Sequence, residues 1–185
     1  ERYLVKKEYK PVAIVPITEY YINSGSNATF GGGKSRITFP VTLPPNTQEW
    51  YYEFSAARDR NAVEQAKSSF NLLSQLTTLI DQTGALGFGM DMLTKPPGGD
   101  VCDVYLLDYD NSRLFEAKTA YYHYPMGSRE NIKSGIVKMA GNAGQTWYLG
   151  IKNPDSMHGI HVAIEVVAIR LDEEWSTRNV QKMNV

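Results

Sequence analysis

Hydrophobic and polar residues alternate along much of the chain, which is the pattern of strands with one buried face. Every second residue is apolar across residues 37–43. In the next such run, the side chains of Trp50, Tyr52 and Phe54 fall on one face and that of Tyr51 falls on the other. We therefore predict two strands, separated by the turn sequence PPNT.

A different period follows, with apolar residues three and four positions apart over residues 61–82. This spacing predicts one long amphipathic helix. Asp59 or Asn61 can cap its start, and Gly84 can end it. The stripe that would face the core consists of Val63, Ala66, Phe70, Leu73, Thr77 and Ile80.

After the helix the pattern returns to short alternating runs with turn residues between them, and an Asp/Asn/Ser cluster at residues 108–112 predicts a hairpin. The further predicted strands are residues 85–93, 101–107, 113–122, 132–141, 145–154 and 160–170. Many strands with one visible helix exclude a parallel α/β fold, which needs repeated crossover helices.

The fold class predicted is all-β, an antiparallel β-sandwich of jelly-roll type with one long α-helix inserted at about 61–82. We expect one domain over residues 1–185. We expect the first ten or so residues and the last twelve or so to be peripheral, with the C-terminal tail frayed.

Composition narrows the classes of function. The chain has 185 residues, 42% of them hydrophobic and 21% charged, and its net charge of −1 offers no basic field for nucleic acid. It contains no run of 18 apolar residues, so we expect no transmembrane segment. Because the chain begins at Glu1 without Met, we expect an exported protein, periplasmic, cell-surface or secreted, whose leader has been removed.

Residues 28–35, ATFGGGKS, match a permissive form of the nucleotide-binding P-loop. A P-loop needs a helix that begins at its Lys-Ser, so that the helix amides face the phosphates. Here Lys34 and Ser35 lead into an alternating run that contains Pro40. We therefore interpret this segment as a flexible loop before a strand.

Other catalytic and metal signals are weak. His158 and His161, three apart on a strand, would point to opposite faces, and the third histidine, His123, lies far away in sequence. The cluster of Asp103, Asp108 and Asp110 lacks the central glycine of a calcium loop, and a hairpin turn is the preferred interpretation.

The chain also carries no Gly-x-Ser-x-Gly elbow. Glu53, Glu116 and Glu165 are expected as ordinary outward residues of strands, and Cys102 as a buried packing residue that forms no disulfide within the chain. We predict no catalytic residue, no metal and no cofactor.

Aromatic runs supply the candidate binding residues. Tyrosine has a flat apolar ring with a polar tip, which suits stacking on sugars and contact with proteins. The outward members of the runs are expected to bind a ligand, and the predicted set is Tyr51, Tyr121, Tyr122, His123 and Tyr124.

The second half of the chain also resembles the closing strands of small secreted jelly-roll or GOLD-like β-sandwich domains. The matching features are a glycine turn at Gly141 or Gly144, the aromatic pair Trp147 and Tyr148, the Asn153-Pro154 turn and the alternating strand 160–169. The resemblance implies a non-catalytic module that contacts protein or carbohydrate, and it assigns no functional residue.

Three functions are left open. The first is an exported, non-enzymatic binding module for a protein or glycan. The second is a secreted hydrolase acting on polysaccharide or peptide. The third is a structural or assembly subunit, and an oligomer that uses the helix stripe or a free strand edge as its interface.

Overall fold

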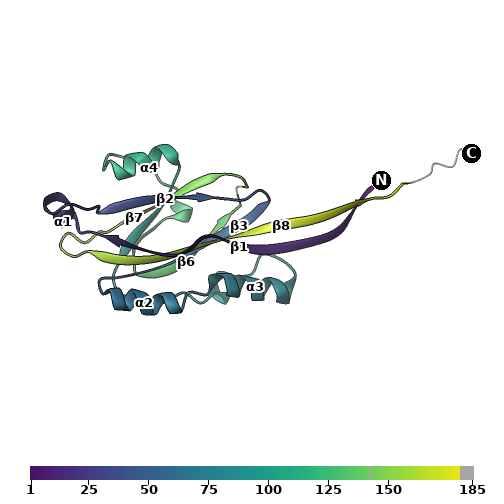
Figure 1. The fold of residues 1–185 in the computed structure, drawn as a ribbon, viewed down its shortest axis with the longest axis horizontal. Coiled ribbons are helices and arrows are strands. Elements are labelled where there is room, and N and C mark those ends of the chain that lie inside the picture. Colours follow the sequence, from purple (N-terminus) through teal and green to yellow (C-terminus); the bar gives the residue numbers. More distant parts are fainter. Residues whose placement is uncertain (142, 180–185) are drawn as a thin grey trace, which may run out of the picture.

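The computed structural model of the chain describes residues 1–141 and 143–179, and its elements are shown in Figure 1. The strands are β1 (Arg2–Ile22), β2 (Arg36–Thr42), β3 (Thr47–Ala57), β4 (Cys102–Leu107), β5 (Arg129–Ile132), β6 (Ser134–Ala140), β7 (Thr146–Lys152) and β8 (Ile160–Thr177). The α-helices are α1 (Gly25–Phe30), α2 (Arg60–Ser68), α3 (Leu72–Thr83) and α4 (Tyr109–Glu116), and two short 3₁₀ turns cover Met90–Met92 and Pro125–Gly127. None of these helices is long and apolar enough to cross a membrane.

The strands form two four-stranded antiparallel sheets that pack face to face. Sheet A has the order β1-β8-β3-β6, and sheet B has the order β2-β7-β4-β5. Early and late strands are neighbours in both sheets, which is the strand order of an eight-stranded jelly roll. The prediction of an antiparallel β-sandwich of jelly-roll type with an inserted helical segment is confirmed.

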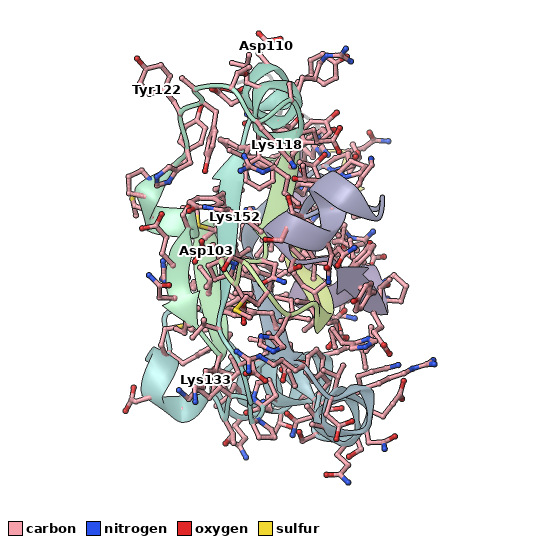
Figure 2. All side chains as sticks on the ribbon, turned by 90° about the vertical axis from the view of Figure 1, so that its left-hand side faces the viewer. Asp103, Asp110, Lys118, Tyr122, Lys133 and Lys152 are labelled. Carbon is pink, nitrogen blue, oxygen red and sulfur yellow. The ribbon has the colours of Figure 1, made fainter. Side chains whose placement is uncertain are left out.

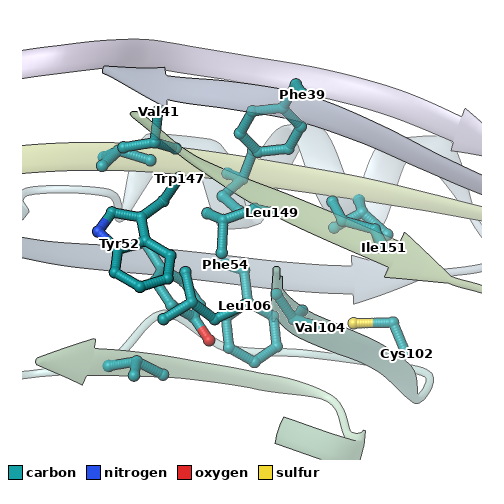
Figure 3. Packing of buried hydrophobic residues seen from close by; sticks show 14 of the residues in the cluster. Phe39, Val41, Tyr52, Phe54, Cys102, Val104, Leu106, Trp147, Leu149 and Ile151 are labelled. Atoms are coloured by element: carbon teal, nitrogen blue, oxygen red, sulfur yellow. The ribbon is translucent and has the colours of Figure 1, made fainter. Parts of the chain in front are cut away.

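The main core lies between the two sheets. Trp50, Tyr52 and Phe54 of β3 point into it and are fully buried, as their alternation predicts. Figure 3 shows Phe54 of sheet A beside Leu149 and Leu106 of sheet B. Each large apolar side chain buried here stabilises the fold by about 1.5–3 kcal/mol relative to exposure. Cys102 belongs to this core, which confirms the expectation of a buried packing residue, and Figure 3 shows it beside Val104.

A helical layer covers the outer face of sheet A, as the lower part of Figure 1 shows. Asp59 caps α2 by accepting a hydrogen bond from the Asn61 amide, and Gly84 ends α3 in the left-handed conformation with φ 65°. The predicted helical segment is divided in two, because a turn at residues 69–71 places Phe70 in a small buried cluster with Ala163 of β8.

Strand β3 has a second face, which lies under this helical layer. Its outward residues are not solvent-exposed, because Leu72 and Leu76 of α3 pack over them. Tyr51 is fully buried in this second cluster, where it stacks on Phe88 with ring centroids 6.4 Å apart. The expectation that Tyr51 points to solvent is therefore wrong.

Several local predictions after the helix are also wrong. Residues 85–93 form no strand, because Gly87 has φ 95° and the segment continues into the 3₁₀ turn Met90–Met92. The predicted hairpin at 108–112 and strand at 113–122 are replaced by α4 and a long loop. Glu116 consequently lies at the end of a helix. The expected loop at residues 28–35 is only partly correct, because residues 28–30 belong to α1, which Ser24 caps by accepting a hydrogen bond from the Asn27 amide. No helix begins at Lys34 and Ser35, which lead into β2, so the argument against a P-loop is confirmed.

The two ends of the described chain form a ribbon that leaves the sandwich, with the N-terminus near its tip in Figure 1. Register partners run from Tyr9 with Leu171 out to Arg2 with Thr177. Residues up to Thr177 are paired in a strand, whereas the C-terminal tail was expected to fray. The pairing of β1 with β8 holds both ends in place. Neither end has a sequence pattern that predicts this pairing. Residues 180–185 of the predicted tail lie outside the described residues.

Candidate functional site

The strongest candidate site is built around α4, which begins directly after β4. Asp108 caps the helix by accepting a hydrogen bond from the backbone amide of Asn111 at 2.8 Å, and its carboxylate also accepts from the Asn111 side chain. Asp110 lies in the first turn, where a negative charge is favoured by the helix dipole. The same Asp/Asn/Ser cluster that suggested a hairpin therefore acts as a helix start.

The loop after α4 is fixed by hydrogen bonds at several points. The Tyr122 amide donates to the side-chain oxygen of Asn111 at 2.7 Å, and the Tyr124 amide donates to the Leu106 carbonyl at 2.9 Å. The Ser128 hydroxyl donates to the Tyr124 carbonyl, accepts from the Leu106 amide and lies 3.1 Å from Nδ1 of His123. The loop is thus held on the end of sheet B.

Edge-on contacts between aromatic rings also hold this loop against the helix and strands beneath it. Tyr121 packs edge-on against Phe115 of α4, with ring centroids 5.1 Å apart, and against Tyr105 of β4 at 5.6 Å. Tyr124 packs edge-on against Trp147 at 4.8 Å. Pairs of this geometry each contribute about 0.5–1.5 kcal/mol beyond the area that they bury. The backbone of the loop is therefore supported by side chains of α4, β4 and β7.

Four large side chains remain exposed on this support. Tyr122 is 85% exposed, Met126 78%, Tyr109 55% and Tyr124 43%. Tyr109 contacts Tyr148, the residue next to the Trp147 that supports Tyr124. Figure 2 shows Tyr122 pointing away from the body of the molecule beside α4. We call these four residues (Tyr109, Tyr122, Tyr124 and Met126) the tyrosine surface.

The predicted binding residues thus separate into three groups. Tyr122 and Tyr124 are exposed on the tyrosine surface. Tyr121 and His123 lie beneath it as half-buried supports, against Tyr105. Tyr51 belongs to neither group, because it is buried under α3 and reaches no external ligand in this structure.

Two exposed residues of the surface were absent from the predicted set. Tyr109 was assigned to a hairpin turn and Met126 to a loop, and neither lies in an aromatic run. The fold joins α4, which carries Tyr109, to the loop that carries the other three residues, through the hydrogen bond from the Tyr122 amide to Asn111. The sequence contains a weak signal for both residues, because each is a large apolar residue within a polar turn or loop sequence, where side chains are usually exposed.

The histidines are distributed over separate sites. Nδ1 of His161 lies 3.0 Å from Glu19, and Nδ1 of His158 lies 3.3 Å from Asp155. Within residues 1–141 and 143–179, no group of three or more His, Cys, Asp or Glu side chains is placed to hold a metal ion.

The three aspartates of the predicted cluster also lie at separate places and make different contacts. Asp103 accepts a hydrogen bond from the Asn131 amide at 2.8 Å and lies 4.0 Å from the Lys152 ammonium. Figure 2 labels Asp103 and Lys152 near each other. Asp108 caps α4, and Asp110 is exposed on it, at the opposite end of β4 from Asp103. These side chains therefore do not converge on one point.

One pair of carboxyl groups is brought together in a way that the sequence did not indicate. Glu53 of β3 and Glu165 of β8 are direct cross-strand partners on the outer face of sheet A, and α3 buries both. Oε1 of Glu53 accepts a hydrogen bond from the Leu72 amide at 3.2 Å. Oε2 has no hydrogen-bond partner among the described residues. Burial, and next the neighbouring Glu165, raise the pKa of Glu53 to about 8.

Comparison of the chain with models of known protein families found no match, and comparison with curated proteins found no significant match. The resemblance to GOLD-like and jelly-roll domains therefore stays a prediction for this chain.

Proposed function

We propose that this chain is a non-enzymatic module that binds a protein partner through the tyrosine surface. One observation carries the proposal. Four large, mostly apolar side chains are exposed on α4 and on the loop that hydrogen bonds and ring contacts fix to it. Tyr and Met are enriched at the centres of protein interfaces. A fixed platform also lowers the entropy lost on binding.

The shape of the surface favours protein over a small sugar ligand. A side chain that lines a cleft cannot keep the exposure of Tyr122 and Met126, so the surface projects from the molecule. Small-molecule sites are concave and enclose most of the ligand. A hollow of about 260 Å³ lies elsewhere, between α2 and β3, and small residues such as Ala57, Ala66 and Gly99 line it.

The hydrolase alternative has a specific weakness. Glycoside hydrolysis needs two carboxyl groups that flank a substrate in an open cleft. Glu53 and Glu165 are close to each other, but α3 covers them, and Glu53 is fully buried. A polymer cannot reach this pair without displacement of the helix. Export of the chain stays a prediction beside this proposal.

The proposal can be tested without a known partner by selecting binders from a random peptide library displayed on phage. The immobilised wild-type chain should enrich peptides that lose at least about tenfold in affinity for a Tyr122→Ala/Met126→Ala double variant, since interface anchors contribute more than about 1.4 kcal/mol. Tyr21→Ala serves as the matched control, because Tyr21 is 57% exposed but belongs to β1.

The same two variants and the wild type should be applied to a glycan array. Peptides whose affinity is equal for the wild type and the double variant would place the binding surface elsewhere. Glycan binding that is lost in the Tyr122→Ala/Met126→Ala variant and kept in Tyr21→Ala, with no peptide enrichment, would replace the protein partner with a sugar.

A further inference from the structure

The ribbon formed by residues 2–10 of β1 and 171–177 of β8 extends beyond the sandwich, and we call it the arm. Sheet A has its last three-stranded contact where Thr47 of β3 pairs with Arg170. The Leu171 amide still donates to the Asn46 carbonyl at 3.0 Å, and beyond it β1 and β8 pair only with each other among the described residues. Figure 1 shows the arm leading away from both sheets and from the helical layer.

A two-stranded ribbon in water is marginally stable at best, because it buries little apolar surface. The arm fits that description. Tyr3 is 49% exposed, Leu4 40%, Val5 53% and Trp175 42%. Ordering these residues in a ladder costs about 1–2 kcal/mol of backbone entropy each. The arm therefore gains from a surface that covers it.

The two faces of the arm differ in character. Leu4 lies opposite Trp175 and Tyr9 lies opposite Leu171, and these pairs share the face that carries α3 further along the sheet. On the other face, Lys6 forms a 2.6 Å ion pair with Glu8. One face is thus an apolar stripe with interspersed charges, and the other is mainly charged.

The two edges of the arm carry opposite charge. Residues 2–10 contain four cations (Arg2, Lys6, Lys7 and Lys10) and one anion (Glu8), which gives +3. Residues 171–177 contain three anions (Asp172, Glu173 and Glu174) and no cation, which gives −3. Each edge also presents unpaired backbone amides and carbonyls, which is the template that adds a further strand.

We propose that the arm binds the arm of a second copy of this chain, with the basic β1 edge of one copy paired to the acidic β8 edge of the next. Strands that pair in this way lie about 4.8 Å apart, so Lys6 and Lys7 of one copy come within reach of Glu173 and Glu174 of the other. The ladder stays antiparallel when both arms point the same way.

This pairing joins two different edges, so it repeats from copy to copy and closes into a ring when the rotation between copies permits. The apolar stripes around Leu4 and Trp175 then face one another inside the ring. The alternative two-fold contact between identical edges places β1 beside β1 or β8 beside β8. It opposes charges of the same sign, which destabilises a ladder.

The test uses a charge-swapped variant of the whole chain, Lys6→Glu/Lys7→Glu/Glu173→Lys/Glu174→Lys. The swap keeps the attraction between the two strands of one arm, because Lys6 faces Glu174 and Lys7 faces Glu173 in the register. Wild type and variant should each form oligomers in sedimentation equilibrium at about 100 µM chain, and added salt should weaken both at least about tenfold.

Mixing the two proteins gives the decisive readout by native mass spectrometry. Edge-to-opposite-edge pairing predicts that they do not co-assemble, since a basic edge would then meet a basic edge. A two-fold contact between identical edges predicts the reverse, a preference for mixed oligomers, and that outcome overturns the proposal. A monomeric wild type at this concentration overturns it as well.

Two controls separate the arm from the rest of the surface. Exchanging charges outside the arm, in Asp81→Lys/Lys118→Glu, should leave oligomers that mix freely with wild type. The Tyr122→Ala/Met126→Ala variant should also assemble normally, so a failure of partner binding at the tyrosine surface and a failure of arm pairing are read independently.

Discussion

Replacing Glu53 with Gln should remove a pH-dependent part of the stability of this protein. Gln has nearly the same shape, and its side-chain oxygen can still accept the hydrogen bond that the Leu72 amide donates to Glu53 at 3.2 Å. Its amide group can donate to Glu165, the cross-strand partner. The substitution therefore deletes the proton that Glu53 gains or loses while it retains the packing under α3.

The sign follows from the direction of the shift. Burial and Glu165 raise the pKa of Glu53 from 4.5 to about 8 in the folded state. Below pH 4.5 both the folded and unfolded states hold the proton. Between 4.5 and about 8 the unfolded state has lost it while the folded state keeps it, so the free energy of unfolding falls as pH rises. One proton gives at most about 1.4 kcal/mol per pH unit, hence a few kcal/mol across this window.

The assay is urea unfolding followed by tryptophan fluorescence at several pH values between about 5 and 9. Wild type should lose stability with rising pH more steeply than Glu53→Gln, and the variant should be the more stable protein at the alkaline end. Asp81→Asn, which removes an exposed acid from α3, should follow the wild-type curve. Parallel curves for wild type and Glu53→Gln would refute the raised pKa of Glu53.

Three further outcomes are expected. Leu149→Ala removes a fully buried side chain between the sheets and should cost about 2–5 kcal/mol in urea unfolding, whereas a loss below about 1 kcal/mol would contradict this packing. Asp108→Ala removes the acceptor for the Asn111 amide and should cost about 1 kcal/mol, with an unchanged stability arguing against the cap. Burial raises the pKa of Cys102 to about 12, so a thiol reagent near pH 8 should label it after unfolding and not before; rapid labelling of the folded chain would show that the site opens.

Some features of the fold followed from short-range pattern. Alternation located β3 and its buried aromatic face, because a strand has a strict period of two. The three- and four-residue spacing located the helical insertion, and Asp59 and Gly84 marked its ends. The sequence pattern did not decide between two local structures where the same residue types favour both. Asp108 and its polar neighbours suit a hairpin turn or a helix start, and Phe115, packed on Tyr105, supports the helix.

The candidate site and the arm depended on contacts between distant parts of the chain. Alternation shows that a strand has two faces, but it does not show what lies against the second one, so Tyr51 and Glu53 were expected in solvent and are buried under α3. Pairing across sheet A brings Glu53 to Glu165, more than a hundred residues away in sequence. The inner face of a strand can be predicted from its own sequence, because burial of one face makes every second residue apolar. The residues that another segment packs against the outer face produce no such alternation, so only the folded chain determines them.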